Sequence, residues 1–297
     1  MGWFSQDTDE QTSESVKGIL GAPLPEGYQP LRTCKEFLLR EGSGGWHRWY
    51  IEVDGVPGLR WNSGLFPVDG FYGERAPLGH TVKPARIAVW QPFTITTREI
   101  EGWHPSLVSI GQRLHWVAPI PNEAEYWKSW DPHAQRHRRQ WLKQEGLTIR
   151  EESIESFIEV YLRTPTKFPQ EIFLHMLRGR ARCHGVHMHP WVMRDDKTGK
   201  ALAGLVVLDA PEVKQSIHLA AFTHPDGFNR SVGVGMIDHW FQEGIRQGFT
   251  YLDFDLFWNQ GDPEAWQGFS RFKGQFGIHY IRYPQPFTNY FLLGRRW

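Results

Sequence analysis

The stretch RSVGVG at residues 230–235 determines which fold this sequence is expected to adopt. It follows an apolar, strand-like run at residues 217–222 and precedes a helical pattern with Val234, Ile237, Phe241 and Ile245 on one face. Glycine has no Cβ, so successive N–H groups can turn inward at the start of such a helix, whose positive end can hold a pyrophosphate. The spacing R-x-x-G-x-G therefore predicts a phosphate-binding loop, formed by Arg230, Ser231, Val232, Gly233, Val234 and Gly235.

The chain before this loop is expected to contain further helices and strands. Asp131 followed by Pro132 predicts the start of a helix that Gly146 stops, because the Asp side chain caps the helix and proline lacks an N–H that would need a partner. A short strand at residues 147–150 follows. Apolar residues at helical spacing over residues 154–162 and 172–177 then predict two amphipathic helices.

A hairpin and a second helix–strand unit complete the pattern. The turn sequence DDKTG at residues 195–199 joins two strand-like runs, 186–193 and 201–208, into an antiparallel hairpin. After the helix that Gly248 ends, the sequence predicts a strand at 251–257, a short helix at 264–272 and a last strand at 278–283. The predicted order is β-α-α-β-β-β-α-β-α-β.

Composition divides the chain into three parts. Residues 1–27 are rich in Ser, Thr, Asp and Glu and are expected to form a flexible acidic tail. Residues 28–121 have frequent Gly and Pro and β-type runs such as HRWYIEV and RIAVW, which predict a strand-rich N-terminal part. Residues 122–297 carry the regular pattern described above and are expected to form the second domain.

The composition also excludes several classes of protein. The 297 residues are 40% hydrophobic and 22% charged, with 33 Lys+Arg against 33 Asp+Glu, as in a soluble globular protein without general affinity for nucleic acid. Two cysteines cannot form a disulfide framework or a four-cysteine zinc site. With no signal peptide and no apolar run long enough to span a bilayer, a cytoplasmic location is expected.

Two clusters of basic residues stand out against the zero net charge. Residues 271–297 contain five basic residues and no Asp or Glu, and a second cluster lies within residues 136–150. The second cluster consists of Arg136, Arg138, Arg139, Lys143 and Arg150. Such clusters can meet phosphate groups, but solvated helix faces produce them as well.

The order of elements around R-x-x-G-x-G resembles the GNAT acyltransferase fold. The runs GFTYLDFD (248–255) and GFSRFKGQFG (268–277) resemble the Fem-type branch of that fold, the peptidoglycan-bridge aminoacyltransferases and their acetyltransferase relatives. In that branch a strand ending in an acidic residue precedes an F-K-x-x-F-G segment, and the basic run RHRRQWLKQEG (136–146) is similar to its basic helix. The resemblance covers roughly residues 120–285.

The resemblance implies an α+β fold with a mixed sheet, GNAT-like in the C-terminal half. Fem-type transferases carry two complete acyltransferase-like domains, whereas only about 95 residues between the tail and Pro121 are available here. The strand-rich part before Pro121 is therefore expected to be smaller, and a truncated GNAT-like domain is one interpretation of it. That departure leaves the use of transfer RNA and of a peptidoglycan substrate open.

Three residues are the candidates for catalysis. The resemblance places Lys273 on the segment facing the acyl-transfer site, where its ammonium could stabilise an oxyanion. Asp253 and Asp255 share one face of an otherwise apolar strand, and either could take a proton from an attacking amine. Pairing of these carboxylates with Arg271, Arg230 or Lys273 is an equally open interpretation.

The histidines and Cys183 give weaker signals. His184, His187 and His189 beside Cys183 match no zinc-site spacing, so no metal is expected. His218 and His224 flank the strand before the glycine loop and could line an acyl cleft, although a hydrogen-bonded structural histidine is the commoner case. A nucleophilic Cys183 is not needed, because acyl transfer in this fold is direct.

The expected function is acyl transfer from acetyl-CoA or another acyl-CoA to an amine or hydroxyl of a small-molecule or cell-wall-precursor acceptor. One alternative is a Fem-type transferase that takes its group from aminoacyl-tRNA, with the basic helix on the RNA. A second alternative, suggested by 15 Trp residues, is a non-catalytic protein whose aromatic first part binds a sugar or peptide.

Overall fold

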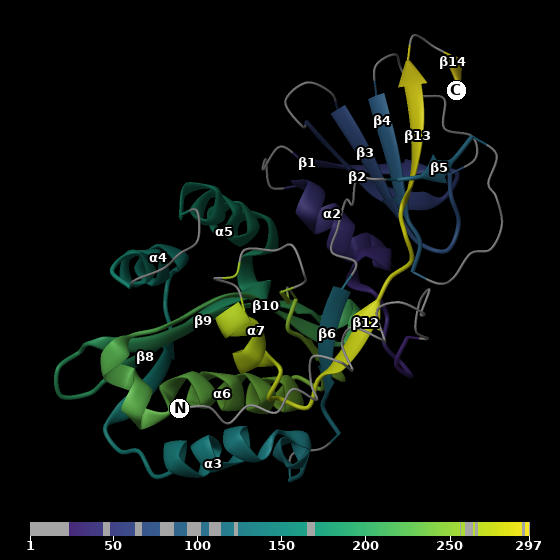
Figure 1. Cartoon of the computed structure of the whole chain (residues 1–297). Coiled ribbons are helices and arrows are strands. Elements are labelled where there is room, and N and C mark those ends of the chain that lie inside the picture. Colours follow the sequence, from purple (N-terminus) through teal and green to yellow (C-terminus); the bar gives the residue numbers. More distant parts are fainter. Residues whose placement is uncertain are drawn as a thin grey trace.

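The computed structural model describes residues 24–43, 48–62, 67–77, 86–93, 102–106, 114–121, 124–164, 170–255, 257–258, 264, 267–292 and 295–296. Its strands form two mixed sheets (Figure 1). Sheet A has the order β1 (Arg48–Val53), β2 (Val56–Asn62), β3 (Pro67–Tyr72), β4 (Arg86–Gln91), β13 (Phe287–Leu292) and β14 (Arg295–Arg296), and β5 (His104–Pro105) also pairs with β13. Sheet B has the order β12 (His279–Arg282), β6 (Leu114–Pro119), β11 (Tyr251–Asp253), β10 (Gln215–Thr223), β9 (Ala201–Ala210), β8 (Met188–Asp195) and β7 (Leu147–Glu151).

The two sheets exchange strands. β6 comes from the first part of the chain but lies in sheet B, between β12 and β11. β13 comes from the end of the chain but pairs antiparallel with β4 in sheet A. Each sheet therefore includes a strand from the other side of Pro121. The predicted domain boundary at Pro121 does not coincide with the division between the two sheets.

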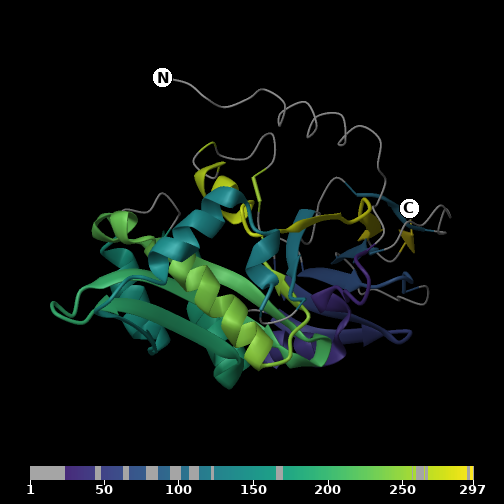
Figure 2. The same ribbon diagram turned by 90° about the horizontal axis from the view of Figure 1, so that it is seen from below.

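Helices cover both faces of sheet B. Figure 1 shows α4 (Ile154–Leu162) and α5 (Gln170–His184) on one face and α3 (Pro132–Trp141) and α6 (Val232–Arg246) on the other, and Figure 2 shows α6 lying across the strands. Two apolar cores correspond to these faces, one with Phe157 and Leu177 and one with Trp240 and Phe241. α2 (Lys35–Ser43) packs between sheet A and α5, and α7 (Gln267–Lys273) lies near the start of α6.

Most of the regular elements predicted for the second half are present. Asp131 caps α3 by accepting a hydrogen bond from the His133 N–H at 2.7 Å, and Pro132 is its first residue, as predicted. The two amphipathic helices, the hairpin β8–β9 and the helix after the glycine loop also match. The predicted α+β class, with a mixed sheet in the second half of the chain, is confirmed. None of the helices in the described part of the chain is long and apolar enough to cross a membrane.

Four elements differ from the predictions. The helix predicted to continue to Gly146 ends at Trp141, because the N–H groups of Lys143 and Gln144 bond to carbonyl oxygens three residues back instead of four. The strand predicted at 251–257 ends at Asp253. The Asp253 side chain accepts a hydrogen bond from the Asp255 N–H at 2.7 Å, and Asp255 has a φ of 54°, a backbone conformation that is incompatible with a β-strand. α2 was not predicted, and neither was β13, whose partner β4 is remote in sequence. The predicted tail falls mostly outside the described residues.

The two parallel strands of sheet B separate where β11 ends. β10 and β11 pair only from Gln215 to Ile217 and from Tyr251 to Asp253. Beyond Ile217, β10 shifts register between His218 and Ala220, as in a β-bulge, and continues to Thr223 without β11 beside it. The chain therefore leaves the sheet after Asp253, and the place where β10 loses this partner is called the opening between β10 and β11 below. Asp253 and Asp255, two of the predicted catalytic residues, lie there.

Candidate functional site

Lys273, the last residue of α7, is buried beside this opening. Its side chain is only 6% exposed, and its Nζ donates a hydrogen bond to the Phe254 carbonyl oxygen at 2.5 Å. The rings of Phe269 and Phe257 lie 5.2 and 5.8 Å from the ammonium. Burial lowers the pKa of Lys273 to about 8, although Asp255 and Asp253 favour its charged form. Lys273 is thus a desolvated cation close to two carboxylates.

The two carboxylates contact different groups. Asp253 is 3% exposed and is near enough to Tyr28 to help raise the pKa of that hydroxyl. Asp255 has a positive φ that turns the chain away from the strand. Its charge raises the pKa of Lys273 more than that of Asp253 does, and it also interacts with Arg32. The structure therefore places Lys273 near Asp253 and Asp255. The two aspartates do not share one strand face as expected, because the strand ends at Asp253, and they have separate partners. Their roles in catalysis stay predictions.

Two tyrosines complete the site, and sequence reasoning missed both. The hydroxyl oxygens of Tyr28 and Tyr283 are 3.2 Å apart, and both side chains are buried. Burial raises the pKa of each hydroxyl, so both tyrosines are neutral at physiological pH. Tyr28 lies at the edge of the predicted tail, and no motif marks either residue. Only the exchange of strands between the sheets brings these parts of the chain together.

His218 lies on the same opening, at the β-bulge of β10. Its ring is half-buried, and burial, followed by the charge of Lys273, holds the pKa of His218 well below its ordinary value. The imidazole is therefore neutral and near Lys273. His224 lies elsewhere, where its Nδ1 accepts the Asp226 N–H at 3.2 Å and caps a short 3₁₀ helix.

The first turn of α6, which contains the predicted phosphate-binding loop, approaches α7. A Cβ on Gly233 would lie 3.3 Å from Thr223 Oγ1 and 3.5 Å from the ring of Phe272, the residue before Lys273. The N–H groups of a helix's first turn have no partner within the helix. The start of α6 and the Lys273 side chain thus lie on neighbouring elements, on either side of Phe272.

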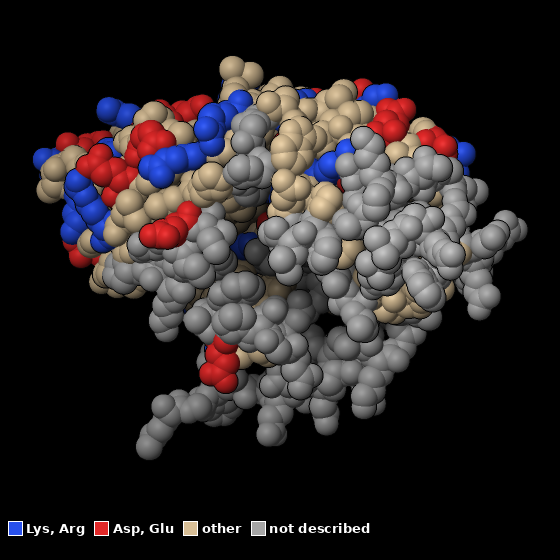
Figure 3. Space-filling model, turned by 90° about the horizontal axis from the view of Figure 1, so that it is seen from above, with Lys and Arg blue, Asp and Glu red and all other residues tan. Residues whose placement is uncertain are grey.

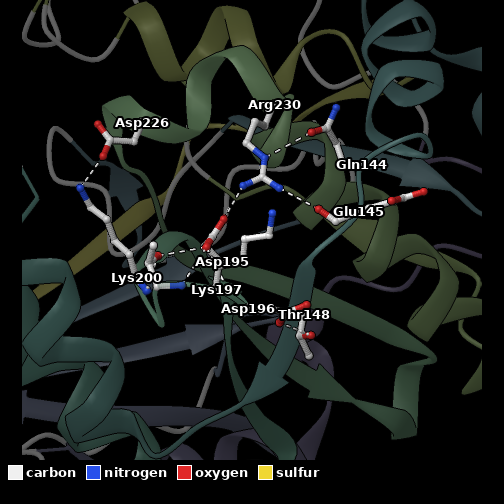
Figure 4. A network of polar contacts seen from close by, with 10 residues as sticks. Gln144, Glu145, Thr148, Asp195, Asp196, Lys197, Lys200, Asp226 and Arg230 are labelled. Atoms are coloured by element: carbon white, nitrogen blue, oxygen red, sulfur yellow. Dashed lines mark hydrogen bonds and ion pairs between the residues drawn. The ribbon is translucent and has the colours of Figure 1, made fainter.

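Arg230 has structural partners (Figure 4). Its guanidinium forms an ion pair with Asp195 at 2.7 Å, and also donates to the Gln144 side chain at 3.2 Å and to the Glu145 carbonyl oxygen at 2.9 Å. Asp195 is the last residue of β8, so Arg230 ties the start of α6 to the end of β8 and to the segment after α3. Contact of Arg230 with a bound phosphate stays a prediction.

Ser231 and Gly235 also have structural roles against α3. The Ser231 hydroxyl lies 2.8 Å from His137 Nδ1, and Ser231 has a φ of 56°. A Cβ on Gly235 would be 2.5 Å from Cδ2 of the Trp141 indole, so only glycine allows α3 and α6 to pack this closely. This packing accounts for the second glycine of R-x-x-G-x-G without a ligand, and phosphate binding by the loop stays a prediction.

The histidines near Cys183 are dispersed. His184 Nε2 lies 3.0 Å from buried Glu41, and His189 lies between Glu151 and Asp209 on the other face of sheet B. Among the residues that the structure describes, no three His, Cys, Asp or Glu side chains are arranged to hold a metal ion.

The basic cluster on and after α3 contains one arginine with a buried partner and four cations that are exposed to solvent. Arg138 forms an ion pair with buried Asp238 at 2.5 Å and thereby fastens α3 to α6. Arg136, Arg139, Lys143 and Arg150 are exposed. On the face seen in Figure 3, Lys and Arg side chains are interspersed with Asp and Glu on the described surface. Of the C-terminal basic residues, the side chains of Arg282, Arg295 and Arg296 lie outside the described part.

Comparison with known proteins identifies the fold. No protein-family model matches the sequence, and no curated protein matches it. The solved structure of FemX matches with a TM-score of 0.66 at 12% identity, over 90% of this chain and 93% of FemX. The C-terminal domain of a putative lysylphosphatidylglycerol synthetase from Agrobacterium fabrum matches with a TM-score of 0.50 at 12% identity, over 85% and 86% of the two chains.

A conserved protein of unknown function from Bacteroides thetaiotaomicron also matches, with a TM-score of 0.51 at 9% identity over 86% of this chain and 90% of that one. The chain has the GNAT-like fold of the Fem type. The likeness extends well beyond residues 120–285, because 90% coverage of this chain takes in strands of sheet A as well as sheet B.

Proposed function

We propose that this protein transfers an acyl or aminoacyl group to an amine or hydroxyl at the opening between β10 and β11. The observation that carries the proposal is the buried ammonium of Lys273 next to Asp253 and Asp255. Lys273 and Asp253 are buried and Asp255 is partly buried. Burying ionisable groups is costly, and such groups are frequent at functional sites. Acyl transfer uses such an arrangement, because negative charge develops on the carbonyl oxygen while the nucleophile loses a proton.

Each of the three residues has a role in this proposal. Lys273, charged below a pKa of about 8, stabilises the oxyanion, and Asp255 holds the ammonium in its charged form. Asp253, which contacts the tyrosine pair instead, receives the proton of the acceptor. Binding of donor and acceptor side by side at this opening supplies much of the remaining acceleration.

We favour acetyl-CoA or another acyl-CoA as the donor. Its phosphates would lie on the first-turn N–H groups of α6, and its thioester would reach Lys273 past Phe272. Gly233, which faces Thr223 and Phe272 with no other group closer than 3.3 Å, supports this position. Arg230 contributes by fixing the loop to Asp195 rather than by holding phosphate.

Aminoacyl-tRNA is the second candidate donor, and two observations favour it. FemX has the highest TM-score of the three structures compared above, and another carries a name that describes the synthesis of lysylphosphatidylglycerol. The exposed cations Arg136 and Arg139 on α3 and Lys143 just after it could contact an RNA backbone. By either route the acceptor would be a cell-wall precursor, a lipid headgroup or a small amine, and we place the reaction in the cytoplasm.

Thermal unfolding with each donor tests the proposal. A donor at about 100 times its Kd should stabilise the fold by about 2.7 kcal/mol. Binding of aminoacyl-tRNA should weaken steeply with salt, whereas binding of acetyl-CoA should change little. Stabilisation by neither donor would contradict acyl transfer and favour a non-catalytic binding protein.

Lys273→Met separates turnover from binding. We expect a loss of about 100-fold in turnover, with little change in donor affinity, because the ammonium acts on charge that forms in the transition state. Lys200→Met is the matched control, since Lys200 is exposed and pairs with Asp226 on the surface. Equal turnover of the Lys273 and Lys200 variants would remove Lys273 from the mechanism.

A further inference from the structure

A cavity of about 390 Å³ lies between residues 24–33 and sheet A, outside the residues that the sequence singled out. Its walls are mainly rings, those of Tyr28, Tyr72, Phe93, Pro30 and Pro57, and exposed Glu74 lies at the rim. The ring of Phe93 packs edge-on against Tyr283, with their centroids 4.8 Å apart. The cavity therefore borders the site of Asp253 through the same tyrosines.

Tyr28 is fixed as the wall between the cavity and Asp253. The Tyr251 hydroxyl donates to the Glu26 carbonyl oxygen at 2.6 Å, and Gln215 Nε2 donates to the Gln29 carbonyl oxygen at 2.6 Å. These bonds attach residues on both sides of Tyr28 to β11 and β10. The Tyr28 ring also packs edge-on against Tyr251, with centroids 5.4 Å apart. Tyr28 thus lines the cavity, and its hydroxyl lies beside Tyr283 and near Asp253.

We propose that this cavity receives the acceptor and that Tyr28 passes the acceptor's proton to Asp253. The proposal rests on the proposed function and deepens it. The Tyr28 hydroxyl lies 3.2 Å from that of Tyr283, and the Asp253 carboxylate is near enough to help raise the pKa of Tyr28. Tyr28 lines the cavity and Asp253, which is 3% exposed, does not, so an acceptor in the cavity would reach Asp253 only through Tyr28.

Over one acyl transfer, every proton that a residue accepts is given up again, so the site returns to its starting state. The entering ammonium first releases one proton to solvent. As the resulting neutral nitrogen forms its bond to the acyl carbon, a second proton passes from it to Tyr28 Oη while the Tyr28 proton passes to Asp253. The bond from the acyl carbon to the donor's sulfur or oxygen breaks, and that atom takes a proton from Lys273. The proton on Asp253 then returns to Lys273. Burial raises the pKa of Tyr28 well above 10, so the hydroxyl relays a proton and is not itself a tyrosinate base.

The walls indicate the class of acceptor. Aromatic and proline rings favour a compact body that is itself a ring or a short apolar chain, and the carboxylate of Glu74 favours a positively charged entrant. We therefore assign the cavity to a primary amine on an apolar or ring-bearing body. Benzylamine is the simplest probe of this class, and benzyl alcohol is its uncharged counterpart.

Transfer to benzylamine from the donor that stabilises the fold tests the relay. Tyr28→Phe should lower kcat by about 100-fold, with KM for benzylamine and donor changed by less than about twofold. Tyr50→Phe is the control, because the Tyr50 hydroxyl donates to Glu52 on the surface of sheet A. An unchanged kcat in Tyr28→Phe, with wild-type transfer intact, would overturn the relay alone.

Calorimetric titration with benzylamine tests the cavity without a donor. We expect binding that Phe93→Ala weakens by at least about tenfold, and weaker binding of benzyl alcohol. Equal binding by wild type and Phe93→Ala would overturn the assignment of the cavity. In a further outcome, benzylamine binds as expected while the wild-type protein transfers an acyl group to it from neither donor. That result would overturn both the proposed function and the relay through Tyr28, but the cavity would still be a binding site for amines.

Discussion

Gly235 of α6 lies directly against the indole of Trp141 of α3, with the position of a Cβ only 2.5 to 2.8 Å from three ring carbons. The two helices therefore contact each other closely at the end of the motif that first indicated the fold. The same packing surrounds the first turn of α6, where the donor phosphates are proposed to lie. A large side chain at Gly235 would disturb both the packing of the helices and the proposed donor site, so only a small substitution tests the packing by itself.

Gly235→Ala should destabilise the protein by about 1–3 kcal/mol, because the new methyl group overlaps Trp141. Gly268→Ala in α7 is the matched control, since a Cβ there meets nothing within 4 Å and alanine favours a helix. Urea unfolding of both variants gives the comparison. Adding Trp141→Leu should recover part of the loss, and equal stabilities of the two alanine variants would show that the helices do not pack as described.

Lys273 should make stability depend on pH in the alkaline range. Its pKa is about 8 in the folded chain and 10.5 when unfolded, so between these values the unfolded chain binds more protons. Stability should therefore rise with pH across this window, by up to about 3 kcal/mol. Unfolding of wild type and Lys273→Met at several pH values measures the difference. A difference that stays constant from about pH 8 to 10.5 would contradict the burial of the ammonium.

His189 should have the opposite pH dependence. Its Nδ1 lies 3.1 Å from Glu151 and its Nε2 3.2 Å from Asp209, and the hydrogen bond to Asp209 raises the pKa of His189 to about 9. The stabilisation is complete below pH 6.5 and is lost as pH rises to about 9. His189→Gln should therefore cost on the order of 2 kcal/mol below pH 6.5 and much less above pH 9.

Asp209→Asn provides the check on this cause. Removal of the principal partner should move the loss of stability to lower pH, and an unshifted profile would mean that Asp209 does not hold the proton on His189. Guanidinium unfolding over the same pH range measures both variants.

Glu41 joins α2 to α5 through a buried cluster of charges. Burial alone would raise its pKa, but Arg180, His184 and Arg48 together hold the pKa of Glu41 well below its ordinary value. Glu41→Gln leaves buried cations without their counter-charge and should cost about 3–5 kcal/mol. Glu36→Gln, on the same helix but exposed, should cost less than about 1 kcal/mol.

The acid range tests the same cluster further. Because the pKa of Glu41 is lowered on folding, its stabilisation is present above about pH 4.5 and is lost as pH falls. Wild type should approach the stability of Glu41→Gln in acid, and parallel profiles in thermal unfolding would contradict the ion cluster.

The second half of the fold could be predicted because its signals are local. The Asp131 cap, the hairpin turn and the helical spacing of Phe157 and Tyr161 each act within a few residues. β6, β11 and β13 pair with strands remote in sequence, and their short runs carry no signal of those partners. In the same way Lys273 and Asp253 could be found from a motif, whereas Tyr28 joins them only through tertiary structure.

The exchange of β6 and β13 also has a consequence for biosynthesis. As the chain leaves the ribosome, β1 to β4 are made first, and β4 keeps an open edge until Phe287–Leu292 emerges. β12, which pairs with β6 in sheet B, immediately precedes β13. Both sheets are therefore completed by one late segment. A nascent chain that stalls before this segment would expose two unfinished sheet edges at once, and would need protection from aggregation until synthesis resumed.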